Sequence, residues 1–211
     1  MKLIKKIFST LVVLAVVIIA IGVGSKYVIK EKFFPYKYQQ YVDTYSSKYN
    51  LDPLFVLAVI KTESKFDDDA HSHKNAVGLM QITVETGEWA AKEMGFSTFS
   101  KDDLYDEEYN IRMGCWYLRR LNDTFDGDLD LTIAAYNAGP TNVQTWLDNE
   151  KYSSDGKSID YIPFGETKKY VDKVDTYYQV YKYFYNKENS YFNKDEIIDM
   201  IRSVFNVHFL S

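Results

Sequence analysis

The sequence is poor in the residues that cross-link or kink a chain. Only one of its 211 residues is cysteine, Cys115, so an internal disulfide and a zinc site built from several cysteines are both excluded. Glycine and proline are also sparse, at 10 and 4 residues, which excludes collagen-like and low-complexity chains. The fold must therefore be stabilised by packing, for which a hydrophobic content of 46% is sufficient.

Positive charge is concentrated at the N-terminus and is in deficit elsewhere. Residues 1–30 contain five lysines and no acidic residue, which leaves 20 basic against 30 acidic groups in the remainder of the chain. An acidic surface repels phosphate backbones, and no stripe of basic residues is visible. We therefore expect no nucleic-acid partner.

A long uncharged run predicts a membrane segment. Residues 7–25 are 19 positions dominated by Leu, Val, Ile and Ala. As a helix they would extend about 28 Å, close to the ~30 Å thickness of the hydrocarbon layer. Lysines within residues 1–6 favour a cytoplasmic N-terminus and an exported remainder. A cleaved signal peptide is the alternative, but the run is longer than the usual apolar core of a signal peptide.

The apolar pattern beyond this segment predicts an all-α domain. After a linker at residues 26–35, apolar residues recur with a period near 3.6 and show little strand-like alternation. Asp52 and Asp106 are suited to cap two of the helices. The exported domain should occupy residues 36–186, with a helical tail at residues 187–211. The apolar and aromatic residues at positions 38, 41, 42, 45 and 49 fall on one helical face, and further helices are expected at about 53–64, 84–94, 107–125, 129–138, 141–148 and 166–186.

One carboxylate shares the apolar face of the helix that begins at Pro53. Glu63 follows Val56, Val59 and Ile60 by seven, four and three residues, so it lies on the same side of the helix. Burial raises the pKa of a carboxyl, and a carboxyl that holds its proton near neutrality can deliver it to a leaving oxygen. The alternative is a glutamate at a helix end that turns back to solvent.

Five groups of residues follow one another in a distinctive order. They are Glu63-Ser64; Ser72 with Ala76-Val77-Gly78-Leu79-Met80-Gln81; Asn110-Ile111 with Gly114 and Tyr117-Leu118; Ala134-Ala135-Tyr136-Asn137-Ala138-Gly139-Pro140; and Ile162-Pro163-Phe164 with Glu166-Thr167 and Tyr170-Val171. Together these groups resemble the catalytic domain of soluble lytic transglycosylases, which are relatives of goose-type lysozyme that cleave peptidoglycan. The resemblance covers about residues 38–186. One departure is His73-Lys74-Asn75, where family members often have Pro-x-Gly; Asn75 tolerates the left-handed backbone that glycine would supply.

The resemblance implies a lysozyme-like helical fold with a groove for a glycan strand of alternating N-acetylglucosamine and N-acetylmuramic acid. Glu63 corresponds to the single acid/base of the family, which forms 1,6-anhydro ends and needs no metal or organic cofactor. The remaining matches imply substrate-binding roles. Ser72 would lie beside the reacting sugar, Met80 and Gln81 under its N-acetyl group, Tyr136 and Asn137 along the cleft, and Glu166 and Tyr170 on the helix that closes its far wall.

Several alternatives remain open at this point. A loop with Asp67, Asp68, Asp69, His71 and His73 resembles a metal cluster, but we expect a hydrated loop. The same aspartates are candidate second carboxylates for a hydrolytic muramidase, and an inactive glycan-binding scaffold is a further possibility. The three tryptophans at positions 89, 116 and 146 are expected to pack in the core rather than stack on sugars. Because the domain is acidic, targeting should depend on the membrane segment or on a protein partner.

Overall fold

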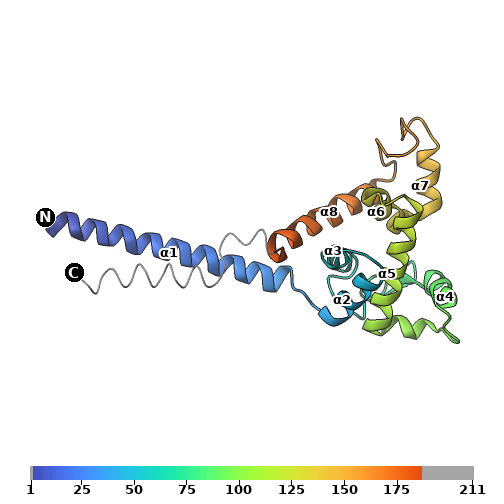
Figure 1. Cartoon of the computed structure of the whole chain (residues 1–211), viewed down its shortest axis with the longest axis horizontal. Helices are drawn as coiled ribbons and strands as arrows, with labels where there is room; N and C mark the ends of the chain where they lie inside the picture. The colour runs from blue at the N-terminus through green and yellow to red at the C-terminus, as the bar shows by residue number, and fades with distance from the viewer. Residues whose placement is uncertain (1, 187–211) are drawn as a thin grey trace. The chain divides into compact units, whose positions relative to one another are not determined.

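The computed structural model describes residues 2–186, and the chain divides into two compact units at the junction of Lys37 and Tyr38. The first unit contains one helix, α1 (Lys2–Phe33), shown in blue in Figure 1. Its segment Val12–Phe33 is long and apolar enough to cross a membrane. The helix continues through residues 26–33, which the sequence analysis assigned to a linker. The predicted helical tail at residues 187–211 lies outside the described residues.

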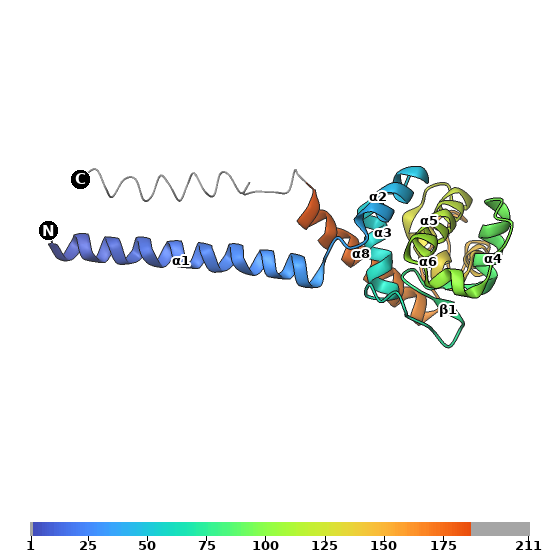
Figure 2. The same ribbon diagram turned by 90° about the horizontal axis from the view of Figure 1, so that it is seen from below.

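The second unit is an almost entirely helical domain, which confirms the predicted fold class. Each helix expected from the apolar period is present, with ends within about two residues of the predicted ones. A short 3₁₀ helix, η1 (Lys101–Tyr105), was not predicted. The other helices, seen from two directions in Figures 1 and 2, are α2 (Gln39–Lys48), α3 (Pro53–Glu63), α4 (Val84–Glu93), α5 (Glu107–Thr124), α6 (Leu129–Ala138), α7 (Pro140–Leu147) and α8 (Gly165–Tyr185).

The two predicted helix caps are formed. The Asp52 carboxylate accepts a hydrogen bond from the backbone N–H of Leu54 at 2.7 Å, and Asp106 accepts one from Tyr109 at 2.8 Å. Each bond satisfies a backbone donor that the first turn of a helix cannot pair internally. The capping residues therefore fix where α3 and α5 begin.

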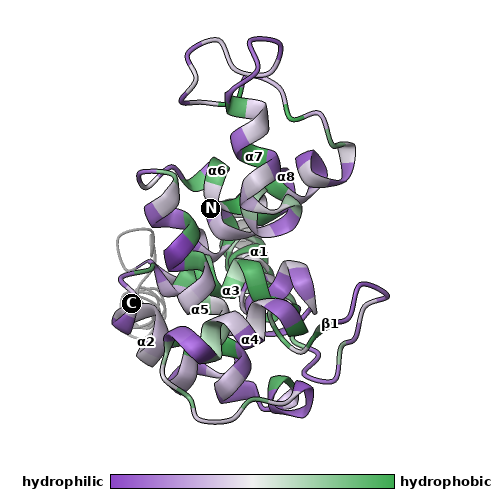
Figure 3. Ribbon diagram, turned by 90° about the vertical axis from the view of Figure 1, so that its right-hand side faces the viewer, coloured by the Kyte–Doolittle hydropathy of each residue, from purple (hydrophilic) through white to green (hydrophobic). Residues whose placement is uncertain are grey.

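Helix α3 lies at the centre of the domain and has no exposed side along most of its length. Every residue from Leu54 to Ile60 is buried, because α8 and α2 pack against this helix. Figure 3 shows α3 in the hydrophobic colour, whereas the helices around it are mixed. The sequence analysis expected one apolar stripe. Glu63 instead ends a helix that is buried on all sides.

A small antiparallel hairpin connects α3 to α4 and was missed by the sequence analysis. Its strands, β1 (Ala76–Val77) and β2 (Ile82–Thr83), pair Ala76 with Thr83 and Val77 with Ile82. Strands of two residues are too short to show alternation. Asn75, just before β1, has a φ of 58°, so it adopts the left-handed backbone expected of it.

Met80, in the turn of this hairpin, packs closely on α5 at Gly114. A Cβ added to Gly114 would lie 2.7 Å from Cε of Met80 and 3.0 Å from its Cβ, and closer still to its Sδ. Met80 is completely buried, so it has little room to move away. Glycine at position 114 therefore permits the hairpin turn to approach the helix.

We predict that Gly114→Ala lowers the free energy of unfolding. Overpacking costs about 1–3 kcal/mol, and the better helix propensity of alanine offsets about 1 kcal/mol of this loss. The matched control is Gly165→Ala in the first turn of α8, where an added Cβ meets no atom within 4 Å. Urea unfolding should show a loss for Gly114→Ala alone; equal stability of the two variants would contradict the close approach.

Candidate active site

Glu63 is held at the C-terminal end of α3 by a hydrogen bond from α8. The hydroxyl of Tyr170 donates to Oε1 of Glu63 at 2.5 Å. Burial raises the pKa of Glu63 to about 7, and this effect exceeds the lowering by the Tyr170 hydrogen bond and by the positive charge of Lys173. The raised pKa agrees in direction with the sequence-based expectation, although Glu63 as a residue is half-buried rather than fully buried. Such a group exchanges its proton near neutral pH.

Two tyrosines from different helices surround this carboxyl. Burial and the charge of Glu63 raise the pKa of Tyr136 on α6 and of Tyr170 on α8. Both phenols therefore stay protonated and act as hydrogen-bond donors. The Tyr136 hydroxyl donates to the backbone oxygen of Met80 at 2.8 Å, which ties α6 to the hairpin turn.

Asn110 on α5 fixes the hairpin turn beneath the site. Its Oδ1 accepts from the backbone N–H of Met80, and its Nδ2 donates to the carbonyls of Val77 and Leu104, each at 2.8 Å. Asn110 is completely buried, so a variant without these bonds would leave three backbone groups unpaired. Met80 also departs from the expected groove contact, because its side chain is 0% exposed and supports the turn from beneath.

Ser72 and Gln81 shape the backbone around the hairpin. The Ser72 hydroxyl accepts hydrogen bonds from the backbone N–H groups of Lys74 and Ala76, at 3.2 and 3.1 Å. The Gln81 amide donates to the carbonyls of Ala70 and Gly78, at 3.0 and 2.9 Å. The sugar contacts predicted for these two side chains stay predictions.

Two adjacent cavities share Asn137 and Ala138, and Tyr136 is the neighbour of Glu63 that lines the first of them. The first, of about 220 Å³, is bordered by Tyr136, β2, α4 and α5, and the second, of about 380 Å³, by the start of α8 and Lys74. Together they form an extended depression, which we call the groove. Gln81 lines the first cavity, and Glu166 lines the second.

Two side-chain interactions at the second cavity differ in how far they are exposed to solvent. The hydroxyl of buried Thr167 donates to Oδ1 of Asn137 at 2.8 Å and so joins α8 to α6. At the mouth, Lys74 and Glu166 form an ion pair at 3.7 Å with both side chains largely exposed. An exposed pair of this kind adds little stability, so both groups remain available to a ligand.

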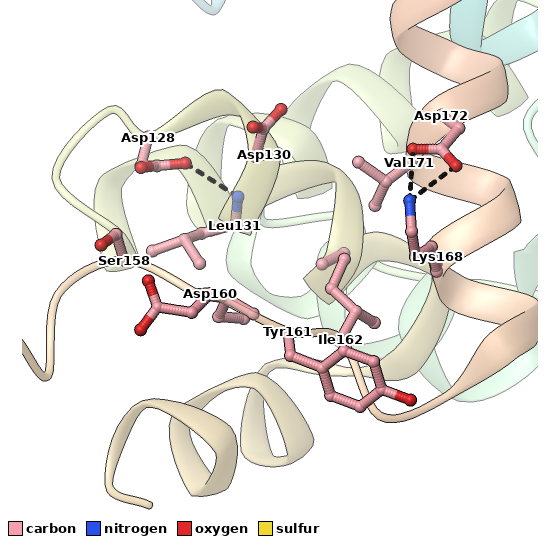
Figure 4. Close-up of a pocket in the computed structure, with 12 residues that line it drawn as sticks. Asp128, Asp130, Leu131, Ser158, Asp160, Tyr161, Ile162, Lys168, Val171 and Asp172 are labelled. Atoms are coloured by element: carbon pink, nitrogen blue, oxygen red, sulfur yellow. Dashed lines mark hydrogen bonds and ion pairs between the residues drawn. The ribbon is translucent and has the colours of Figure 1, made fainter. Parts of the chain in front are cut away.

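A further cavity, of about 270 Å³, lies between α6, α8 and residues 158–162 (Figure 4). It contains none of the predicted site residues. Lys168 and Asp172, which form an ion pair at 2.8 Å, lie two residues before and after Tyr170 and so face the opposite side of α8. This cavity is therefore separate from the groove.

Three residues near the groove, Asn110, Tyr117 and Thr167, had no functional role predicted from the sequence. Tyr117 lines the first cavity, and its ring centroid lies 5.4 Å from that of Tyr136. A signal for Asn110 was available, because it is a polar residue four positions before Gly114 on the buried face of α5. Thr167 has no comparable signal, since a hydroxyl is common on either face of a helix.

Other residues considered at the sequence level have structural explanations. Burial raises the pKa of Cys115, so its thiol stays neutral, and the residue is part of the core. Trp116 and Trp146 are 9% and 3% exposed and pack in the core as predicted, but Trp89 is 42% exposed and does not. Within residues 2–186, no three His, Cys, Asp or Glu side chains gather closely enough to hold a metal ion.

The raised pKa of Glu63 predicts a pH-dependent gain of stability for Glu63→Gln. The neutral carboxyl stabilises the fold below the ordinary pKa of 4.5, and this stability is lost as pH rises through about 7. Glutamine stays neutral at every pH and can still accept from Tyr170. Above pH 7 the variant should be more stable than the parent by about 1–3 kcal/mol, whereas below pH 4.5 the difference should vanish. Urea unfolding across this range would reveal a pH-independent difference if Glu63 were solvated.

The sequence of this chain is similar to one family of known proteins. Residues 40–159 match the family model described as the transglycosylase SLT domain. Soluble lytic murein transglycosylase of Escherichia coli strain K12 is 34% identical over 156 residues, which are 73% of this chain and 24% of that protein.

Solved structures extend the similarity to three dimensions. The 70 kDa soluble lytic transglycosylase of Escherichia coli aligns with a TM-score of 0.67 and 30% identity, over 80% of this chain and 27% of the other. An inactive mutant of the lytic transglycosylase Slt of Pseudomonas aeruginosa aligns with a TM-score of 0.65 and 28% identity. This alignment covers 79% of this chain and 28% of the other. The chain thus spans only about a quarter of the length of these relatives. It belongs to the transglycosylase SLT domain family.

Proposed function

We propose that this protein is a membrane-anchored lytic transglycosylase that cleaves peptidoglycan. The bond cut is the β-1,4 link from N-acetylmuramic acid to N-acetylglucosamine, and the product is a 1,6-anhydromuramic acid end. The observation that carries the proposal is the buried carboxyl of Glu63, whose pKa of about 7 lets it serve as both acid and base. Family membership and the groove beside Tyr136 support it.

In the first step Glu63 acts as the acid. Its proton passes to the glycosidic oxygen, and the bond from C1 of the muramic acid to that oxygen breaks. The carbonyl oxygen of the sugar's own N-acetyl group attacks C1 and forms an oxazolinium-like intermediate. Glycosidases commonly need two carboxylates, but an internal nucleophile of this kind replaces the second. One glutamate at the end of α3 is then sufficient.

In the second step the ionised Glu63 acts as the base. It takes the proton of the C6 hydroxyl, and this oxygen bonds to C1 while the bond from C1 to the N-acetyl oxygen breaks. Glu63 is thereby protonated again, and no water is consumed. The Tyr170 hydrogen bond stabilises the carboxylate between the two steps, because it favours the ionised form.

The groove would supply the position and distortion of the sugar that acid/base chemistry alone does not provide. We assign Asn137, whose Oδ1 is already paired with Thr167, to donate through its amide nitrogen to the glycan. Gln81 and Tyr136 border the first cavity and Glu166 borders the second, so they would contact successive sugars. Ser72 would act beside the reacting sugar, and Met80 would support the turn from below.

Helix α1 would place the catalytic domain at the wall. By length and composition the segment Val12–Phe33 can span a bilayer, and the lysines before it favour a cytoplasmic N-terminus. The domain would then lie outside the membrane, where peptidoglycan is found. A cleaved signal sequence would export the same domain without the anchor.

Product analysis tests the proposed chemistry. The parent protein, incubated with purified peptidoglycan, should release fragments that end in 1,6-anhydromuramic acid, and Glu63→Gln should reduce their release by about 10²- to 10⁴-fold. Mass spectrometry distinguishes these ends from reducing ends, which are heavier by one water. Reducing ends would instead identify a hydrolase, and binding without any release would identify a scaffold.

The pH profile tests the role of the Tyr170 hydrogen bond. The acid must be protonated in the free enzyme, so kcat/KM should be constant below pH 7 and fall above it. Tyr170→Phe removes a bond that favours ionised Glu63, so the alkaline limb should move to higher pH by roughly one unit. Tyr136→Phe is the control, because that hydroxyl donates to Met80 instead. If kcat/KM fell at the same pH in the parent, in Tyr170→Phe and in Tyr136→Phe, the result would argue against Glu63 as the titrating acid.

A further inference from the structure

Trp89 on α4 is the one tryptophan of this chain that is not in the core, with 42% of its surface exposed. Helix α4 packs on the domain through Gly87, Ala90 and Ala91, so its buried contacts are made by small residues. The largest side chain of the helix is therefore left at the surface. A large part of this flat apolar side chain therefore remains in contact with solvent.

Trp89 lies next to two residues that line the first cavity of the groove, although it does not line the cavity itself. Thr86, three residues earlier and so about one turn away on α4, lines that cavity. Tyr117 lines it as well, and its ring centroid lies 6.2 Å from that of Trp89 at an interplanar angle of 79°. Tyr117 in turn contacts Tyr136 beside Glu63. A row of aromatic rings thus leads from the neighbourhood of the acid to Trp89.

The indole ring is also held in place by its neighbours. Trp116 meets it edge to face, with centroids 4.8 Å apart, and the Arg120 guanidinium lies 5.9 Å from the ring centroid. Edge-to-face pairs and cation–π contacts each restrict how a ring can turn. An exposed aromatic surface that is fixed before binding loses little conformational freedom when it contacts a ligand.

We propose that Trp89 is a saccharide-binding residue that extends the groove beyond its first cavity, by stacking on a sugar ring of a β-1,4-linked amino-sugar strand. The inference rests on the proposed function, since that function places a glycan in the groove. The apolar C–H face of a pyranose ring matches a flat indole. A strand that continued past Thr86 and Tyr117, which line that cavity, would meet Trp89 next. Trp89 acts on long strands and leaves the chemistry at Glu63 unchanged.

The contact is tested by measuring the affinity for oligosaccharides in the absence of cleavage. Every protein used is the whole chain in detergent micelles, and every protein carries Glu63→Gln. The probes are β-1,4-linked oligomers of N-acetylglucosamine, one a trimer and one a hexamer. Trp89→Ala should weaken hexamer binding about three- to tenfold and leave trimer binding within about twofold. Trp89→Phe keeps an aromatic ring and should recover most of the loss. The control is Tyr183→Ala, which removes a 50% exposed ring that lines neither groove cavity and should change neither affinity.

Acrylamide quenching of tryptophan fluorescence provides a direct readout of contact. Saturating hexamer should shield the exposed indole of Trp89, and this protection should disappear in Trp89→Phe, where only buried Trp116 and Trp146 remain. A merely structural Trp89 would show no such protection. Urea unfolding of each variant separates lost stacking from lost stability.

The outcomes distinguish this inference from the proposed function. Equal weakening of trimer and hexamer, unchanged hexamer affinity in Trp89→Ala, or no hexamer binding by the parent overturns the role of Trp89. Release of anhydromuramic ends by the protein with native Glu63 is measured separately. Length-dependent binding through Trp89 without such release would retain the inference and reject the transglycosylase activity.

Discussion

The removal of one carboxyl from water is the constraint on which the site depends. Burial at the end of α3 raises the pKa of Glu63 to about 7, while Tyr170 and Lys173 act in the opposite direction. Neither partner offsets the effect of burial on the pKa. This balance requires that α3 be enclosed by α2 and α8, so the acid depends on the whole packing of the domain rather than on a local motif.

The helical framework was accessible from the sequence because its signals are local. Asp52 and Asp106 cap helices where predicted, since a cap needs only the next few residues. The hairpin and η1 were missed because their elements span two to five residues, too few for a period to be visible. Their positions are set by tertiary contacts, above all by the three hydrogen bonds of Asn110.

The raised pKa of Glu63 was predicted from the sequence, but its physical cause was predicted less well. A single apolar stripe placed Glu63 on the buried side, yet α3 proves to be buried all round. Met80 was expected to touch substrate, and its full burial shows a supporting role that only the close approach of Gly114 reveals. Trp89 was expected in the core, but it is exposed. Helix α4 buries its small residues instead, and the number of tryptophans in the sequence does not indicate this choice.

Helix α8 makes two contacts on the groove side that belong to different tasks. Tyr170 lowers the proton affinity of Glu63, and Thr167, one turn earlier, is bonded to Asn137, which lines both cavities. Both side chains belong to the same helix. A displacement of this helix would thus change the pKa of Glu63 and the width of the groove in a single movement, so any ligand that moved α8 would alter both together.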